Sequence, residues 1–156
     1  MGLTAEDTLV LRPDYWVAFH WKRLLGASVL NATSSDPSVR AYAFFGTPAS
    51  PYAPPECRNT TQLLLLNLDA SGTSVVLPAT GASSAYAAWT LSAGPAGSFG
   101  QQIALNTQVL PTVVDVANGG DRDPTWLGLV SVAPVRGTAT GGLLLAAQSI
   151  SFVCYV

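Results

Sequence analysis

The sequence predicts an all-β protein, an antiparallel β-sandwich of about eight strands that follows a single helix. Residues 28–156 contain short apolar or β-branched runs separated by Gly, Pro, Ser, Asn and Asp, a spacing typical of sandwich domains. Only one segment, Pro13–Gly26, has the pattern of a helix. A chain of 156 residues buries roughly 68–70% of the surface that its unfolded form would expose. We therefore expect a domain with a core of its own.

The expected helix begins at Pro13-Asp14 and ends at Gly26. Proline is favoured in a first turn, glycine is favoured after the last turn, and Lys22 and Arg23 lie where the helix dipole favours positive charge. The apolar residues of this helix occupy most of its circumference; they are Tyr15, Trp16, Val17, Phe19, Trp21, Leu24 and Leu25. A helix that is apolar nearly all round is buried on several sides, whereas one sheet covers only one side. We therefore expect packing partners beyond the predicted sheet.

The strands are expected in short segments along the rest of the chain. These segments are Ser28–Leu30, Val39–Phe45, Gln62–Leu68, Ser74–Leu77, Ala85–Leu91, Gln102–Leu105, Thr112–Val116, Leu129–Ala133 and Ser149–Tyr155. Leu63–Leu66 does not alternate between apolar and polar residues, which predicts a central strand covered on both faces. Val39–Phe44 and Ser149–Cys154 alternate in part, which predicts one packed face and one solvent-exposed face.

Composition and charge exclude several classes of protein. The chain is 49% hydrophobic and 10% charged, against a usual charged share of about 25%, so we do not expect a disordered chain. The net charge of −2 and the absence of a basic run argue against a nucleic-acid partner. The longest apolar stretch, Leu143–Val156, is shorter than the roughly 20 residues that span a bilayer, so no transmembrane segment is expected. Residues 1–7 carry acids where a signal peptide needs cations, so we expect no signal peptide in this chain.

Few residues could carry catalysis or hold a metal ion. Glycoside hydrolysis needs two opposed carboxyl groups, and the close pair Asp121 and Asp123 lies among Gly and Pro residues that indicate a solvent-exposed turn. The single histidine, His20, lies within the aromatic helix, where we expect a structural role. One histidine and two cysteines are too few for a zinc site, and no nucleotide-binding motif is present. We therefore expect no metal and no cofactor.

The cysteines and two sequons indicate a secreted glycoprotein. Cys57 and Cys154 are compatible with one disulfide in an oxidising compartment. Asn31 and Asn59 each begin an Asn-X-Thr sequon in a context that resembles a loop, so both are candidate glycosylation sites.

Aromatic side chains provide an alternative to a purely structural role. In β-sandwich binding modules, exposed aromatic rings can stack on sugars. Trp126, which follows the Asp121-Arg122-Asp123-Pro124 loop, is the candidate sugar-stacking residue. The alternative hypothesis is therefore a stand-alone carbohydrate-binding β-sandwich. A third hypothesis is a degenerate product with no stable fold, which would expose apolar surface and aggregate.

An ordered series of segments resembles the C-terminal part of heparanase and plant heparanase-like proteins, members of glycoside hydrolase family 79. Pro13–Trp16 and Trp21–Leu30 resemble the last helix of the (β/α)8 barrel of that family and the residues that follow it. The later segments resemble the C-terminal β-sandwich of the family; they are Val39–Ala43, Leu63–Leu68, Ile103–Asn106 and Ser149–Val153. The resemblance implies two parts: residues 1–27 as the last barrel loop and helix, and residues 28–156 as the β-sandwich domain.

The resemblance implies a parent enzyme that is a retaining glycosidase, an endo-β-glucuronidase. In the family, both catalytic glutamates lie on barrel strands upstream of this helix, and no position in this chain corresponds to them. We therefore assign no catalytic residue and expect the chain to be inactive alone. Met1 stands where the family places a substrate-facing tyrosine before Gly2, so we expect a fragment.

The resemblance also implies a role for the chain: to support the packing, folding and secretion of the barrel. The upstream barrel is the expected partner, with glycan as a second candidate, and the residues expected to face the barrel are Trp16, Phe19, Trp21 and Leu25. A disulfide often joins an early strand of the family's β-sandwich to the chain end. Cys154 fits the second position, whereas Cys57 lies beyond the strand that holds the first. The family location is secreted or extracellular, lysosomal, or membrane-associated.

Overall fold

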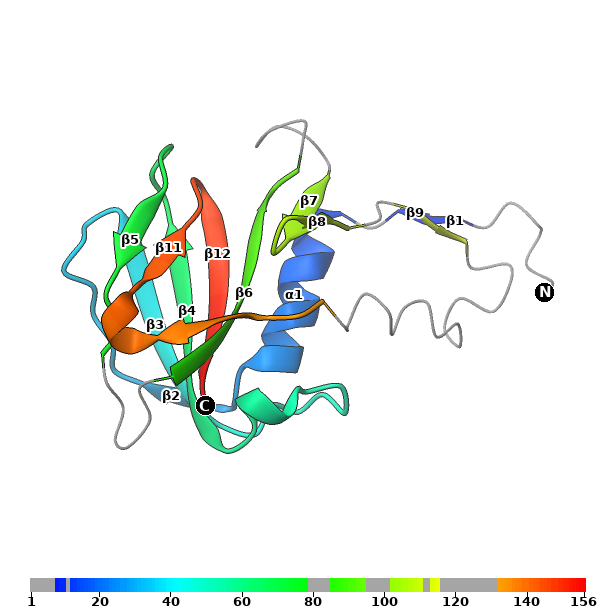
Figure 1. The fold of residues 1–156 in the computed structure, drawn as a ribbon. Helices are drawn as coiled ribbons and strands as arrows, with labels where there is room; N and C mark the ends of the chain where they lie inside the picture. The colour runs from blue at the N-terminus through cyan, green and yellow to red at the C-terminus, as the bar shows by residue number, and fades with distance from the viewer. Residues whose placement is uncertain (1–7, 11, 79–84, 95–101, 111–112, 116–131) are drawn as a thin grey trace.

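The computed structural model describes residues 8–10, 12–78, 85–94, 102–110, 113–115 and 132–156. These residues form one α-helix, α1 (Pro13–Leu24), two short 3-10 helices, η1 (Pro55–Cys57) and η2 (Ala139–Gly141), and a set of strands joined by turns and loops (Figure 1). The strands are β1 (Thr8–Val10), β2 (Ser28–Leu30), β3 (Val39–Gly46), β4 (Thr60–Asn67), β5 (Thr73–Val75), β6 (Ala85–Ala93), β7 (Ile103–Leu105), β8 (Gln108–Val109), β9 (Val113–Asp115), β10 (Val135–Thr138), β11 (Leu143–Leu145) and β12 (Ser149–Tyr155). The predicted all-β fold class, with a single α-helix, is confirmed for the described residues.

Most strands belong to one antiparallel sheet of eight strands. Its order is β2-β3-β4-β12-β6-β7-β8, and β10 pairs with β6 beside this path. Two smaller pairs are β5 with β11 and β1 with β9. The predicted central position of Leu63–Leu66 is confirmed, because β4 pairs with β3 on one side and with β12 on the other.

The main sheet lies between α1 and the small β5–β11 sheet, as Figure 1 shows. The core cluster on the α1 side contains Trp16, Leu24, Leu64, Trp89 and Phe152. The cluster on the opposite side contains Leu63, Leu65, Val153, Leu143 and Leu145, the last two from β11. Side chains of a strand point alternately to opposite faces, so β4 and β12 supply residues to both clusters. The helix therefore shares the cluster on its own side with the sheet, and the second cluster lies on the other face.

The predicted solvent-exposed face of Ser149–Cys154 is wrong. Ser149 and Ser151 are buried on the β5–β11 side, and the Ser151 hydroxyl hydrogen-bonds that of Thr90 at 2.7 Å. Serine in this strand marks a buried polar pairing, so partial alternation did not indicate contact with water. The partly exposed face predicted for Val39–Phe44 is confirmed, because Arg40 and Tyr42 are exposed whereas Val39 and Ala43 are buried.

Several short strands were not predicted. β8, β10 and β11 have two to four residues each, too few for a periodic pattern, and β10 contains an arginine and a glycine. The helix ends at Leu24, and the chain is extended at Leu25. Most of the predicted strand 129–133 lies outside the described residues. No helix in the described ranges is both long and apolar enough to cross a membrane.

Candidate functional site

The helix α1 has an unusual distribution of polar and apolar side chains. Its buried residues are Trp16, His20, Arg23 and Leu24, which lie within one stripe of the helix and face the sheet. Trp21, by contrast, is 43% exposed. Two of the four buried positions are thus occupied by titratable residues, while Trp21, one of the two tryptophans of the helix, is exposed. A buried histidine and a buried arginine beside an exposed tryptophan depart from the usual division of a surface helix into an apolar inner stripe and a polar outer face.

The exposed side of Trp21 continues onto the sheet. Its ring packs edge-on against the ring of Phe44, with centroids 5.4 Å apart. Val29 pairs with Phe44 across β2 and β3, and Tyr42 lies two residues from Phe44 on the same face. Val29 is 72% exposed and Tyr42 is 46% exposed. We call Trp21, Val29 and Tyr42, which surround Phe44, the Trp21 patch.

The remaining sides of α1 differ from the Trp21 patch. Tyr15 and Phe19 stack with centroids 6.2 Å apart and are half-buried against the core of this chain. The outermost stripe consists of Asp14, Ala18 and Lys22, all exposed. The helix therefore has apolar surface on its flanks, whereas its outer stripe contains two charged residues and an alanine. The expectation of apolar surface nearly all round is corrected accordingly.

The four residues predicted to face a barrel fall into two groups. Trp16 and Leu25 lie in the core of this chain and have almost no surface left for another domain. Phe19 is half-buried and Trp21 is exposed. Trp21 and, on the opposite flank, Phe19 keep surface that is open to contact with another domain, and a contact with a barrel stays a prediction. Sequence reasoning missed Val29 and Tyr42, although the early strand positions were predicted.

His20 is completely buried among aromatic rings. Its ring lies 5.2 Å from that of Phe19 and 6.1 Å from that of Phe152, centroid to centroid, and neither ring nitrogen has a hydrogen-bond partner among the described residues. Burial, together with the nearby charge of Arg23, lowers the pKa of His20 from 6.5 to about 3. The imidazole is therefore neutral at neutral pH, and its protonation opposes folding.

The stability of the protein is expected to decrease in mild acid because of His20. The folded-state pKa of about 3 is below the ordinary 6.5, so the unfolded chain takes up the proton first as the pH falls. The contribution is complete above pH 6.5 and is lost progressively towards pH 3. We expect the free energy of unfolding to fall by about 2 kcal/mol between about pH 7 and about pH 5. Urea titrations of the wild type and His20→Leu measure this, and a wild type whose pH slope matches the variant would contradict it.

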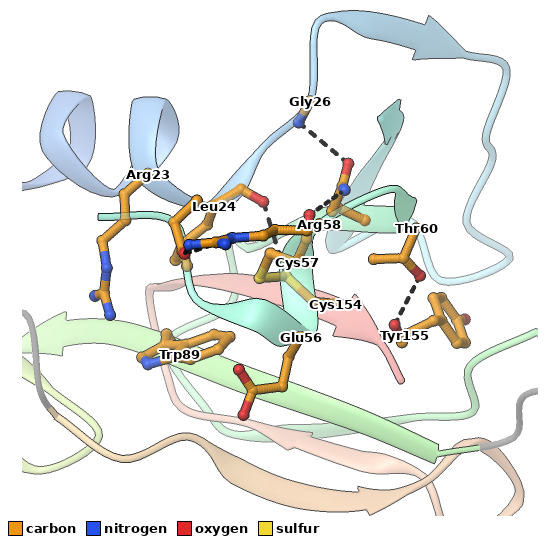
Figure 2. Close-up of a disulfide and its surroundings, with 12 residues drawn as sticks. Arg23, Leu24, Gly26, Glu56, Cys57, Arg58, Thr60, Trp89, Cys154 and Tyr155 are labelled. Atoms are coloured by element: carbon orange, nitrogen blue, oxygen red, sulfur yellow. Dashed lines mark hydrogen bonds between the residues drawn. A yellow bond between two sulfur atoms is a disulfide. The ribbon is translucent and has the colours of Figure 1, made fainter. Parts of the chain in front are cut away.

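Arg23 is the other buried titratable residue of α1, and its side chain reaches from the helix to the segment before β4. Its Nε donates a hydrogen bond to the carbonyl oxygen of Tyr52 at 3.2 Å, and its guanidinium carbon lies 5.8 Å from the ring centroid of Trp89. Burial lowers the pKa of Arg23 to about 10, and the carboxylate of Glu56 acts in the opposite direction. Glu56 also forms an ion pair with Arg136 of β10. Figure 2 shows Arg23, Glu56 and Trp89 around the disulfide.

Cys57 and Cys154 form a disulfide, as the sequence suggested. It joins η1 to β12, both residues are fully buried, and the Cα atoms are 5.1 Å apart. The carbonyl oxygen of Leu24, at the end of α1, lies 3.7 Å from Cys154 Sγ (Figure 2). The disulfide therefore attaches the connection between β3 and β4 to β12, close to the C-terminal end of α1.

Gln62, which sequence reasoning did not single out, connects three segments: the residue after the helix, the end of β3 and η1. Its Oε1 accepts a hydrogen bond from the Gly26 amide at 3.1 Å. Its Nε2 donates to the carbonyl oxygens of Gly46 at 2.7 Å and Cys57 at 2.9 Å. A side chain on Gly26 would place its Cβ 2.3 Å from the carbonyl oxygen of Phe45, which explains the glycine there. The signal in the sequence was an amide at each end of an apolar run, Gln62 before Leu63 and Asn67 after Leu66.

The acidic side chains that the structure places act mainly as loop anchors. The carboxylate of Asp36 accepts hydrogen bonds from the Ser38 amide and hydroxyl, and these lower its pKa. Asp69 accepts the equivalent pair from Ser71, with the same effect on its pKa. Within the described ranges, no three His, Cys, Asp or Glu side chains gather as metal ligands. Asp121 and Asp123 lie outside the described residues.

The remaining predicted site residues are surface positions or are not described. Asn31 and Asn59 are both exposed, as glycosylation requires, and Asn59 has a positive φ of 53°. Trp126, the candidate sugar-stacking residue, lies outside the described residues. Two open clefts lie beside the β5–β11 sheet, with volumes of about 360 and 370 Å³. The first has an apolar floor that includes Leu63 and Leu65.

Comparison with models of known protein families finds no match, and comparison with curated proteins finds no significant match. The resemblance to heparanase-like proteins therefore rests on the ordered segments of the sequence.

Proposed function

We propose that the chain is the C-terminal, non-catalytic part of a heparanase-like glycoside hydrolase, whose full-length form hydrolyses O-glycosyl bonds of the β-glucuronide type. In this proposal α1 is the last helix of a (β/α)8 barrel, and the β-sandwich packs against that barrel and supports its folding and secretion. The chain itself contributes no catalytic residue.

The observation that carries this proposal is the Trp21 patch. An exposed cluster of apolar side chains on a soluble domain marks a surface that binds another protein surface. Tryptophan and tyrosine are also enriched at the centres of protein interfaces. The patch adjoins the helix that resembles a barrel helix, so a barrel is the partner that agrees with both the sequence and the surface.

Complementation of a truncated barrel tests the proposal. A heparanase-like glycosidase that ends before its last barrel helix is co-expressed with this chain, and hydrolysis of an aryl glucuronide is measured. We expect the chain alone to be inactive and the pair to form a soluble, active complex. Trp21→Asp is expected to weaken the complex by about 2 kcal/mol or more, roughly thirtyfold in Kd, because interface tryptophans carry much of the binding energy.

Leu144→Asp is the matched control for Trp21→Asp. Leu144 is also exposed and apolar, but it lies on β11, on the opposite side of the main sheet. It should leave complementation unchanged. Equal loss in both variants, or no complementation by the wild type, would contradict the proposal. Glycan binding by the isolated chain that is abolished by Trp126→Ala would favour a carbohydrate-binding β-sandwich instead.

A further inference from the structure

The outer edge of the main sheet is apolar and open at β2. The three residues of this edge strand are all exposed, and its neighbour in the sheet is β3. On the face opposite α1, Leu30 and Phe45 are exposed on adjacent strands, since Ser28 pairs with Phe45 and Leu30 pairs with Ala43. An edge strand of this kind is a template for pairing with another chain, because its outward backbone groups have no partner strand among the described residues.

Charge does not protect this edge. Residues 28–30 contain no charged residue and no proline, the two devices that commonly block pairing at edge strands. The nearest cation in β3 is Arg40, whose Nη1 donates a hydrogen bond to the carbonyl oxygen of Pro37 at 2.8 Å. That bond directs the guanidinium towards the turn before β3. If the chain is to stay monomeric, something other than charge or proline must therefore block pairing at the β2 edge.

A sequon lies directly beside the open edge. Asn31 follows Leu30, and both Asn31 and Thr33 are exposed. Ala32, between them, packs against the core cluster on the side of the β5–β11 sheet, so this segment is held on the face where Leu30 and Phe45 are exposed. An N-linked glycan is bulky and hydrophilic. On Asn31 it would stand over the edge without displacing a buried group.

We propose that Asn31 carries an N-linked glycan and that this glycan prevents β2 from pairing with β2 of a second copy of the chain. The buried disulfide supports the required environment independently, because disulfides persist in the oxidising compartments of the secretory route. The proposal shares with the proposed function only the passage through that route. Asn59 differs from Asn31, because it precedes β4, which has neighbouring strands on both sides.

The test uses the whole chain with a secretion leader, expressed in a eukaryotic cell line and recovered from cells and medium together. Mass spectrometry of peptides measures glycan occupancy at Asn31, and light scattering after size-exclusion chromatography measures the molecular mass. We expect an occupied Asn31 and a monomer. Trimming the glycan of the folded protein to a single sugar with an endoglycosidase is expected to produce dimers or larger species. Asn31→Gln should do the same.

Two further variants separate edge pairing from misfolding. Leu30→Lys combined with Asn31→Gln is expected to restore the monomer, since a lysine on an edge strand blocks pairing. Asn59→Gln is the matched control and should remain monomeric. An unoccupied Asn31, or a monomer after both trimming and Asn31→Gln, would overturn the proposal. Because the leader is supplied and no barrel is present, none of these results depends on whether complementation of a barrel succeeds.

Discussion

Replacing both Cys57 and Cys154 with alanine is expected to lower the free energy of unfolding by about 4–5 kcal/mol. The disulfide closes a loop with a sequence separation of 97 residues, so its loss returns a large conformational entropy to the unfolded chain. The bridge also fixes η1, from which Glu56 reaches Arg136. Urea unfolding of the oxidised wild type and of the double variant, followed by tryptophan fluorescence, measures the difference.

The reduced wild type is the control for this prediction. It keeps the sulfur atoms in the core but removes the covalent link, so it separates the entropy of the loop from the loss of packing at two fully buried positions. We expect the reduced wild type to show most of the destabilisation. A decrease of less than about 1 kcal/mol on reduction would contradict the assignment of a main stabilising role to this bridge.

Gln62→Leu is expected to lower the free energy of unfolding by about 3–5 kcal/mol. The change removes the three hydrogen bonds of a fully buried side chain and leaves the Gly26 amide and the carbonyl oxygens of Gly46 and Cys57 without their side-chain partner. A buried polar group that loses its partner destabilises the fold by more than the average net contribution of one hydrogen bond to stability. Denaturant unfolding at neutral pH measures the effect.

Gln108→Leu is the matched control for Gln62→Leu. Gln108 is an exposed residue of β8, so the same chemical change should alter the free energy of unfolding by less than about 0.5 kcal/mol. Hydrogen exchange of the Gly26 amide adds a local measurement, because this amide should exchange faster in Gln62→Leu. Equal effects in the two variants would show that Gln62 does not anchor the three segments.

The features predicted correctly from the sequence depend on short-range patterns. Pro13 and the cations near Leu24 marked the helix, and the run Leu63–Leu66 marked a strand buried on both faces. The residues that give each signal belong to one continuous segment, so that segment alone is enough to predict its helix or strand. The strands β10 and β11 are too short for such a pattern, and their pairing partners are distant in the chain.

The composition of the candidate site depended on the rotation of α1, which the sequence left undetermined. Apolar residues on several sides of a helix give no single hydrophobic direction, so Trp16 and Trp21 were equivalent candidates. In the structure one is in the core and the other is exposed. Gln62 was missed for a related reason: its three partners come from segments that only the folded chain brings together.

The central position of β12 has a consequence for biosynthesis. The strand that β4 and β6 both pair with follows them in the chain, at residues 149–155. Until this segment has been synthesised, β4 and β6 lack the strand that joins the β2-β3-β4 and β6-β7-β8 parts of the sheet. Contacts between residues so distant in sequence form slowly and leave unpaired strand edges open to aggregation.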